Sequence, residues 1–186
     1  MSENIFFDKS RLRRIGNNVI IGKTVRIRYP ELVEIGDNVI IDDFTYISTE
    51  LAVSNNVHIA SGCKLIGGNK AMIRIGELST LAPNVVLAAG SDDYIAGIAS
   101  PLVDLKYKGN VEIGYVNIER HCIVGTNTTI LPNVTLYDGS AVGAQSLVKT
   151  DIPEWMLYGG VPARYLKDRD REEILRLEEL WRSEEK

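Results

Sequence analysis

The 186-residue sequence predicts an all-β fold in which short parallel strands coil into a solenoid. Three observations predict this fold. Large apolar residues recur every six positions, small or β-branched residues follow four positions after them, and asparagine or glycine stands between the two. Because six is an even number, an extended chain presents the same face at every repeat, whereas six is not a helical period. Repetition at a fixed short period is the signature of repeat architectures.

The large apolar position is the most regular of the three. From Ile118 it recurs through five consecutive steps of six, and the same frame appears in earlier blocks that short insertions separate. One straight strand from Ile118 to Val148 would be roughly 100 Å long, whereas strands usually have about 3–10 residues, so the chain must bend at every hexad. The frame consists of Ile15, Ile21, Ile27, Ile35, Ile41, Ile47, Val53, Ile59, Leu65, Ile75, Leu81, Leu87, Ile118, Val124, Ile130, Leu136, Val142 and Val148.

Asparagine and glycine supply the predicted bends, because both tolerate positive φ angles. They stand three positions after the large residue, at Asn18, Asn38, Asn56, Asn84, Asn127 and Asn133, with Gly62 and Gly139 in equivalent places. The small residue one position further on faces inward with the large one. Both cysteines, Cys63 and Cys122, fall at this small inward position. The pattern therefore predicts reduced core thiols rather than nucleophiles, metal ligands or a disulfide.

Composition narrows the class of function. The formal net charge of -4 and a pI near 5.3 do not favour nucleic acid or an anionic membrane as a partner. No stretch approaches the ~18 apolar residues that cross a bilayer, and the polar start at Met1–Asn4 lacks the features of a signal peptide. We therefore expect a cytoplasmic protein that acts on small molecules.

The repeat frame divides the chain into a cap at residues 1–14, a solenoid at 15–165 and a short C-terminal helix at 166–186. Interruptions lie at 28–31, 66–70 and 88–110, and the last is long enough to cover a functional site. Ile174, Leu177 and Trp181 recur at helical spacing among charges. We expect this helix to cover the open end of the solenoid or to contact another subunit.

Five local motifs in this frame resemble the hexapeptide-repeat acyltransferases, in particular their sugar O- and N-acetyltransferase branch. They are Ala82–Val85 with Leu87, Gly125–Leu136, Asp138–Ala144, Lys149–Pro153 and Gly159–Arg164. The resemblance covers roughly residues 15–165. It implies a single-stranded left-handed β-helix with a triangular section, a homotrimer with active sites between subunits, and acetyl-CoA as the acyl donor without a metal. Apolar residues at outward positions, Ile20, Ile40, Ile123 and Leu147, suit a subunit contact.

In this family CoA lies along the groove between subunits, with its pantetheine chain beside small residues of the C-terminal coils. The positions that match are Gly125, Thr126, Gly143, Ala144, Lys149, Pro162 and Arg164. Glycine and alanine let a ligand approach the backbone closely, and cations can meet the CoA phosphates. For the glycines, turn geometry alone is the alternative explanation.

Acyl transfer needs a nucleophilic amine or hydroxyl on the acceptor and a group that takes its proton. Many sugar acetyltransferases of this family place a histidine shortly after the Pro-Asn-Val segment, but the equivalent residue here is Asp92. The usual base is therefore absent. An amine is nucleophilic once it is neutral and demands less of a base than a hydroxyl does, so N-acetylation is favoured.

Two histidines and two aspartates remain as candidates for the proton. His121 occupies a corner position just after the long segment, and we predict a catalytic or substrate-orienting role for its imidazole, with a corner role as the alternative. Asp92 and Asp93 could orient His121, bind an ammonium group or act as the base, or they could form a solvated turn. His58 precedes an inward residue, so we expect it to point outward and to have a packing role.

Other functions on this fold fit less well. A γ-class carbonic anhydrase needs three histidines for its metal, and the chain has two. A sugar-nucleotide pyrophosphorylase would need an additional nucleotide-binding domain. The preferred reading is an acetyltransferase that acts on the amino group of a nucleotide-linked amino-deoxysugar in surface polysaccharide biosynthesis. The alternatives are transfer to a sugar hydroxyl and, less favoured, a non-enzymatic scaffold.

Overall fold

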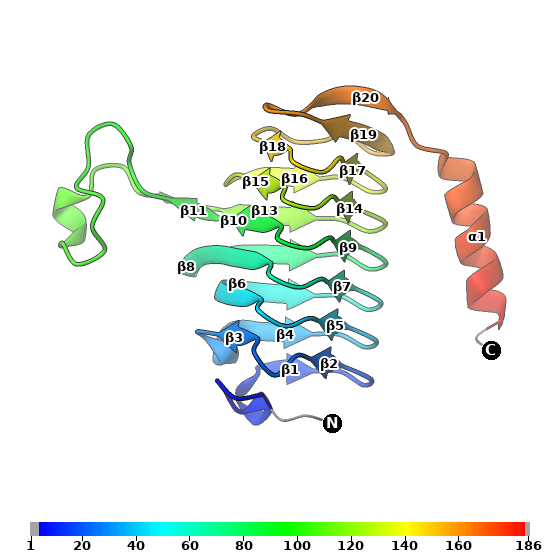
Figure 1. Cartoon of the computed structure of the whole chain (residues 1–186), viewed down its shortest axis with the longest axis horizontal. Coiled ribbons are helices and arrows are strands. Elements are labelled where there is room, and N and C mark those ends of the chain that lie inside the picture. The colour runs from blue at the N-terminus through cyan, green and yellow to red at the C-terminus, as the bar shows by residue number, and fades with distance from the viewer. Residues whose placement is uncertain (1–3, 185–186) are drawn as a thin grey trace.

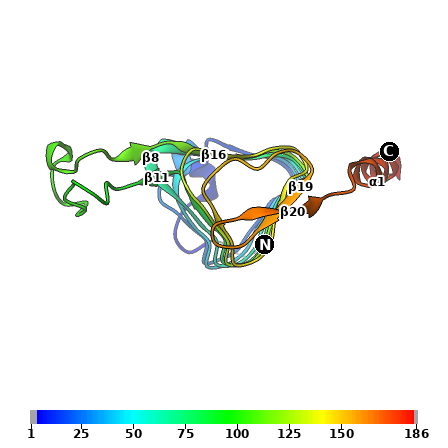
Figure 2. The ribbon, with the colours of Figure 1, turned by 90° about the horizontal axis from the view of Figure 1, so that it is seen from above.

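The computed structural model describes residues 4–184. The chain forms a single-stranded left-handed parallel β-helix of about seven coils with one C-terminal helix, which confirms the predicted fold class. The coils stack in chain order along the long dimension of the prism (Figure 1). Viewed from above, they outline a triangle (Figure 2). The residues expected to form the N-terminal cap include positions 1–3, which lie outside the described residues, and η1 (Lys9–Arg11) precedes the first strand.

Each coil contributes strands to three flat faces of the prism. The first face contains β1 (Arg14–Ile15), β4 (Val33–Ile35), the ends of β6 (Tyr46–Val53) and β8 (Lys64–Ile75), β13 (Tyr115–Ile118) and β16 (Val134–Leu136). The second face contains β2 (Ile20–Ile21), β5 (Ile40–Ile41), β7 (His58–Ile59), β9 (Thr80–Leu81), β14 (Ile123–Val124), β17 (Ala141–Val142) and β19 (Met156–Gly159). The third face contains β3 (Arg26–Ile27), the starts of β6 and β8, β10 (Val86–Ala88), β15 (Thr129–Ile130) and β18 (Leu147–Val148).

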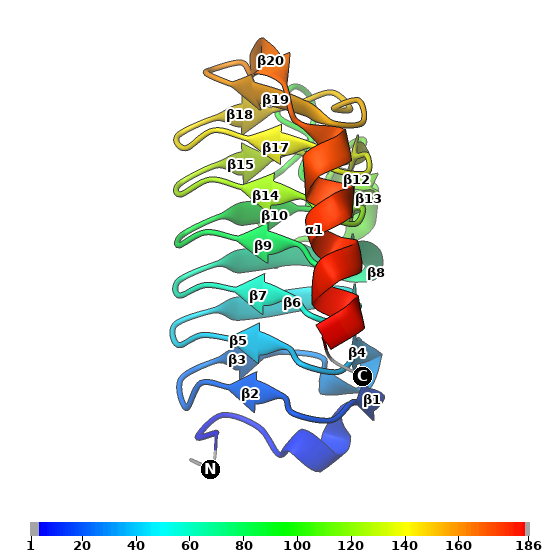
Figure 3. The same ribbon diagram turned by 90° about the vertical axis from the view of Figure 1, so that its right-hand side faces the viewer.

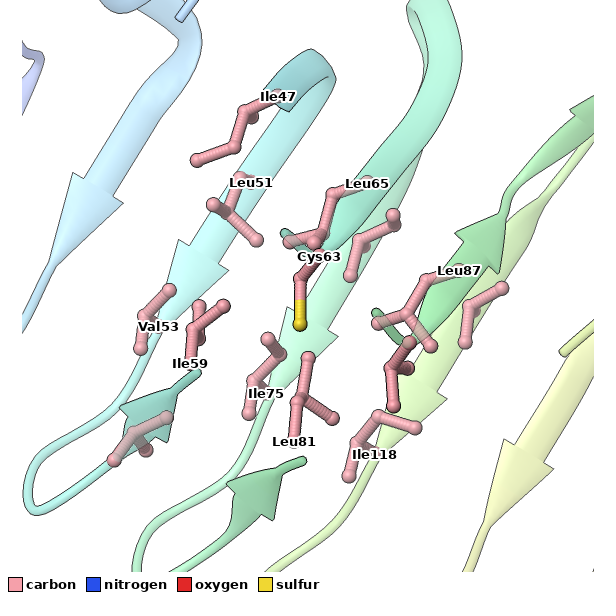
Figure 4. Packing of buried hydrophobic residues seen from close by; sticks show 14 of the residues in the cluster. Ile47, Leu51, Val53, Ile59, Cys63, Leu65, Ile75, Leu81, Leu87 and Ile118 are labelled. Atoms are coloured by element: carbon pink, nitrogen blue, oxygen red, sulfur yellow. The ribbon is translucent and has the colours of Figure 1, made fainter. Parts of the chain in front are cut away.

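The hexad frame sets the register of these strands. On the third face Ile47, Leu65, Leu87, Ile130 and Val148 pair in one continuous column. All five side chains are buried, and Figure 4 shows the first three with their neighbours inside the prism. Burying a side chain of this size stabilises a fold by about 1.5–3 kcal/mol, so the repeated column is a main source of stability.

The predicted asparagines form the corners. All six have φ between 51° and 61°, the left-handed region that the sequence predicts for them. Between the first and second faces their side chains also form a ladder, in which Asn18 donates to Asn38 at 2.9 Å and Asn38 donates to Asn56 at 3.2 Å. These side-chain bonds satisfy polar groups at an edge where the backbone turns. Asparagine therefore adopts the positive φ that each corner requires, and its side chain also connects successive corners by hydrogen bonds.

Both cysteines are fully buried at inward positions, as predicted. Burial raises the pKa of Cys63 and of Cys122 to about 11, so both thiols stay protonated at neutral pH. We expect a thiol reagent to modify neither cysteine in the folded protein at pH 7 and both in denaturant, as absorbance of the released chromophore would report. Rapid modification of either cysteine in the native protein would contradict this prediction.

The three interruptions of the repeat all lie at the corner between the third and first faces. The first contains η2 (Pro30–Leu32), the second lies within β8, and the third is the long segment from 89 to 114, here called the arm. The arm projects far from the prism (Figures 1 and 2). Its root is tied to the second interruption, since Ala89 donates to Ile66 at 2.7 Å. Stacking of the coils thus brings the last two insertions together.

The C-terminal region differs from its predicted placement. The end of the solenoid is covered by β20 (Arg164–Asp168), which pairs antiparallel with β19 and satisfies its edge. The helix α1 (Arg171–Glu184) instead runs alongside the coils (Figure 3), and none of its residues is buried. The expectation that it covers the open end was therefore wrong. The helix also begins at Arg171 rather than at 166 as predicted, because residues up to Asp168 pair with β19 as β20. The last predicted helical positions, 185 and 186, lie outside the described residues.

Candidate active site

The arm and the insertion in β8 enclose a hollow of about 350 Å³, here called the arm-root pocket. Ile66, Val111 and Ile113 supply apolar walls, whereas Lys70 and Asp92 bring charges of opposite sign. The pocket exists because two insertions from successive coils meet at one corner. Antiparallel pairing of β11 (Gly90–Ser91) with β12 (Glu112–Ile113) holds the two halves of the arm at its floor. A concave site with apolar walls and a few convergent polar groups is typical of small-molecule binding.

The two adjacent aspartates have different surroundings. Asp93 accepts backbone N–H groups of Asn110 at 2.9 Å, Ile95 at 2.8 Å and Ala96 at 3.1 Å. The Asn110 bond joins the outgoing and returning halves of the arm, the other two fix the local turn after Asp93, and all three lower the pKa of Asp93 below its ordinary value. Asp92 instead lines the pocket, and one of its carboxylate oxygens lies 2.7 Å from the Lys108 ammonium. The geometry thus gives Asp93 a structural position and leaves Asp92 facing the pocket.

The lowered pKa of Asp93 predicts how the arm responds to acid. A carboxyl whose pKa is lower in the folded state stabilises that state above its unfolded pKa, and the contribution disappears as the pH falls through the folded value. For Asp93 this loss lies below roughly pH 4. We expect amide hydrogen exchange at 93–110 to accelerate below this pH in the native protein, relative to the coils, and Asp93→Asn to remove the pH dependence. Equal pH dependence in the variant would contradict the assignment.

His121 lies at a corner of the prism with φ of 58°, as its place in the hexad predicts. Its ring does not project into solvent, however, because α1 covers it and the residue is 8% exposed. The imidazole Nε2 lies 2.7 Å from a carboxylate oxygen of Glu178 on α1, and Arg120 bonds both oxygens of that carboxylate at 2.6 Å. The carboxylate that faces His121 is therefore Glu178, rather than Asp92 or Asp93 as the sequence suggested.

This cluster anchors α1 to the prism. Burial raises the pKa of the Glu178 carboxyl, but hydrogen bonds from Arg182 and His121 and the charge of Arg120 lower it by more, so that it lies below its ordinary value. Arg182 also pairs with Glu77 at 2.9 Å, one coil away. A charged group that is mostly withdrawn from water is stable only with partners of this kind. Glu178 could not be identified from the sequence. The helix carries many charged residues, and nothing in their order shows which of them contacts the prism.

His121 and the aspartates do not meet within one protomer. The first face separates them, since β13 runs from the root of the arm near Gly114 to the corner at His121. Seven residues of extended chain span roughly 20 Å. The two regions lie at different corners of the triangle in Figure 2, with the arm at one and α1 beside another. The catalytic role of His121 stays a prediction. His58 does point outward, 2.8 Å from Asp42 on the second face.

Four of the predicted CoA residues, Gly125, Thr126, Gly143 and Ala144, stack at the corner between the second and third faces, here called the small-residue edge. The two glycines differ in kind. A Cβ on Gly125 would lie 2.5 Å from the Ala144 nitrogen, so packing of the coils explains this glycine. A Cβ on Gly143 would meet nothing nearer than 3.6 Å. Packing therefore does not explain why residue 143 is a glycine. The space beside it is open, so a ligand could approach the backbone closely there.

The other predicted CoA residues lie near the C-terminal end of the third face. Leu147 exchanges backbone hydrogen bonds with Gly160 at 3.0 Å and Ala163 at 2.8 Å, which places the segment that carries Pro162 beside β18. Lys149 follows β18 directly, and Arg164 begins β20. Both cations are exposed. The set thus runs from the small-residue edge across the end of the solenoid.

Two further properties concern residues 4–184. No cluster of three or more histidine, cysteine, aspartate or glutamate side chains among them could hold a metal ion. No helix in this range is long and apolar enough to cross a membrane.

The repeated coils, the small-residue edge and the pocket beside a projecting arm define the class of hexapeptide-repeat acyltransferases. No protein-family model matches the chain. It is 30% identical over 175 residues to dTDP-4-amino-4,6-dideoxy-D-glucose acyltransferase of Escherichia coli, across 91% of this chain and 88% of that protein. The chain therefore belongs to the family of CoA-dependent sugar acyltransferases built on this repeat.

Further relatives include N- and O-acyltransferases. AntD, an N-acyltransferase from Bacillus cereus solved with dTDP and 3-hydroxybutyryl-CoA, superposes with a TM-score of 0.89 at 33% identity and covers 99% of this chain and 100% of that one. Galactoside O-acetyltransferase of Escherichia coli K12 is 27% identical over 144 residues, 74% of this chain and 66% of that protein. The relatives thus include enzymes that transfer an acyl group to nitrogen and enzymes that transfer one to oxygen.

Proposed function

We propose that this protein transfers an acetyl group from acetyl-CoA to the amino group of a nucleotide-linked amino-deoxysugar, a precursor of surface polysaccharide, in the cytoplasm. The observation that carries the proposal is the Asp92 carboxylate, which lines the arm-root pocket beside apolar walls. A carboxylate attracts the ammonium form of an amino sugar, and apolar walls suit a ring carbon that lacks a hydroxyl. The relative from Escherichia coli and AntD, solved with dTDP-4-amino-4,6-dideoxyglucose and CoA, support this acceptor class.

The proposed step assigns the proton to Asp92. The ammonium of the bound sugar loses a proton to the carboxylate, and the neutral nitrogen attacks the thioester carbonyl. The N–C bond forms and the C–S bond breaks. CoA leaves as a thiolate that takes up the second proton, which the nitrogen loses as the amide forms, and Asp92 returns the first proton to solvent. An aspartate is also the residue replaced by alanine or asparagine in two AntD structures, which supports a carboxylate as the group to test.

A second copy of the chain completes the proposed site. Asp92 lies at the arm corner, whereas the small-residue edge lies at the opposite end of the third face, roughly 15–20 Å away for five or six extended residues. We propose a homotrimer in which the arm of one protomer meets the small-residue edge of the next. Exposed apolar side chains support it, namely Tyr94, Ile95 and Leu102 on the arm and Ile20, Ile40 and Ile123 on the second face.

Transfer to a sugar hydroxyl is the second candidate, and the likeness to galactoside O-acetyltransferase favours it. A hydroxyl must lose its proton as it attacks, so it requires a stronger base than an amine that is already neutral. The only ionisable side chains that line the pocket in residues 4–184 are Lys70, Asp92 and Glu112. The pocket therefore suits an amine better than a hydroxyl.

The decisive experiment measures CoA release with a panel of acceptors. We expect acetyl-CoA and dTDP-4-amino-4,6-dideoxy-D-glucose to give turnover. The matched sugar with a hydroxyl in place of the amine should give at least about 10²-fold less, since it carries no charge for the Asp92 carboxylate to attract and requires a stronger base. Turnover with UDP- and GDP-linked amino sugars, compared with the dTDP-linked one, measures the preference for the nucleotide. Turnover with 3-hydroxybutyryl-CoA, compared with acetyl-CoA, measures the preference for the acyl group. Turnover with the hydroxyl sugar alone would support O-acetylation. No turnover and no acetyl-CoA binding would support a scaffold.

A further inference from the structure

Asp92 and Lys108 form an ion pair between the two halves of the arm. Asp92 lies on the outgoing half and Lys108 on the returning half, just after η3 (Leu105–Tyr107), and the ammonium is 2.7 Å from one carboxylate oxygen. The Lys108 side chain is 11% exposed, whereas that of Asp92 is 44% exposed. Lysine is rarely this buried unless its charge is paired. The pair is therefore a built feature of the arm rather than a chance contact on its surface.

The pair also decides how the Asp92 carboxylate faces the arm-root pocket. Among residues 4–184 Lys108 is the only polar partner of this carboxylate, and it engages one oxygen. A contact at one oxygen favours the rotamers that maintain it and leaves the second oxygen available to a ligand. Without that contact the carboxylate would sample several rotamers. Geometry of this kind matters, since displacing a reacting group by about 1 Å can cost about 10²-fold in rate.

We propose that Lys108 is a positioning residue, which acts on acyl transfer by orienting Asp92 toward the acceptor. This inference rests on the proposed function. Fastening the two halves of the arm is a separate task, which Asp93 performs through the backbone N–H of Asn110. Lys106, two residues earlier, is exposed and stacks on Tyr107 at 4.8 Å. It offers a matched control with the same charge on the same arm.

The test compares Lys108→Met with Lys108→Arg and Lys106→Met in steady-state assays with acetyl-CoA and dTDP-4-amino-4,6-dideoxy-D-glucose. We expect Lys108→Met to lower kcat by about 10- to 100-fold while KM for acetyl-CoA stays unchanged, because only the geometry of the acceptor site is lost. Lys108→Arg should restore most of the turnover, and Lys106→Met should leave it unchanged. Melting curves by circular dichroism verify that each variant is folded.

A double-mutant cycle separates positioning from a structural role. If Lys108 acts through Asp92, then Lys108→Met lowers kcat no further in an Asp92→Ala background. Equal loss in both backgrounds, or an active wild type in which Lys108→Met has no effect, would overturn the inference and leave the proposed function intact. A wild-type protein that acetylates hydroxyl sugars only, or no sugar at all, would overturn the proposed function and the inference with it.

Discussion

Replacing Asp92 by asparagine is expected to lower kcat by about 10²–10⁴-fold, the range that a positioned proton acceptor contributes. The asparagine amide keeps the size of the side chain but removes both the charge that attracts an ammonium group and the ability to take its proton. Among residues 4–184 the Asp92 carboxylate accepts no backbone hydrogen bond, so the coils should fold unchanged, whereas the arm should be loosened where Lys108 loses its charged partner. Steady-state kinetics with the dTDP-linked amino sugar and thermal melting would measure the two effects.

The neighbouring aspartate is the natural control. Asp93→Asn weakens the bond from Asn110 that closes the arm and two local backbone bonds, so it should loosen the arm and lower turnover much less than Asp92→Asn does. A larger loss of kcat in Asp93→Asn would reverse the assignment of the two residues. Unchanged turnover in Asp92→Asn would return attention to His121 of a neighbouring protomer or to a mechanism in which the acceptor amine needs no base.

The second large effect concerns the core. Leu87→Ala is expected to lower the free energy of unfolding by roughly 2–5 kcal/mol, because it removes buried methyl groups and leaves a cavity that rigid coils cannot close. Leu87 is fully buried and pairs with Leu65 on one side and Ile130 on the other. Each coil of a solenoid contacts only its neighbours, so damage in one column is not shared among distant residues. Equilibrium urea unfolding would measure the loss.

Leu102→Ala provides the control for this measurement. It removes the same atoms from a side chain that is 93% exposed within one protomer, so it should leave the packing of the coils intact, and any loss should come from the proposed contact between protomers. A loss that matches that of Leu87→Ala without dissociation of the trimer would contradict the proposed packing. A trimer that dissociates on Leu102→Ala would instead support the arm as a contact between protomers, which sedimentation would detect.

The tertiary contacts change how His121 is understood. Its corner position follows from the period of six, but that period says nothing of what lies outside the corner. In the folded chain α1 approaches from a distant part of the sequence and places Glu178 against the ring. His121→Ala is therefore expected to loosen α1, and a change in turnover would show whether this region also contributes to the site of another protomer.

The candidate site was predictable only in part. Asp92 was found because it stands where the family usually has a histidine, and Gly143 because the C-terminal motifs match. Lys108 and the apolar walls of the pocket were missed, because the arm follows no period that assigns its residues a direction. No sequence signal links residue 92 to residue 108 or places 66–70 against 111–113. These contacts depend on how two insertions fold against each other.

The sequence alone determined the coil. A period of six in an extended chain decides which side chains face inward, so Cys63, Leu87 and the corner asparagines could be placed without coordinates. The tertiary structure decided the position of everything outside that period: α1 beside the coils, Asp93 as the fastening of the arm, and Asp92 in the pocket with Lys108. The physical reason is the distance along the chain over which the contacts act. Which side chains of a repeat point inward is a local property, whereas these placements depend on contacts between residues far apart in the chain.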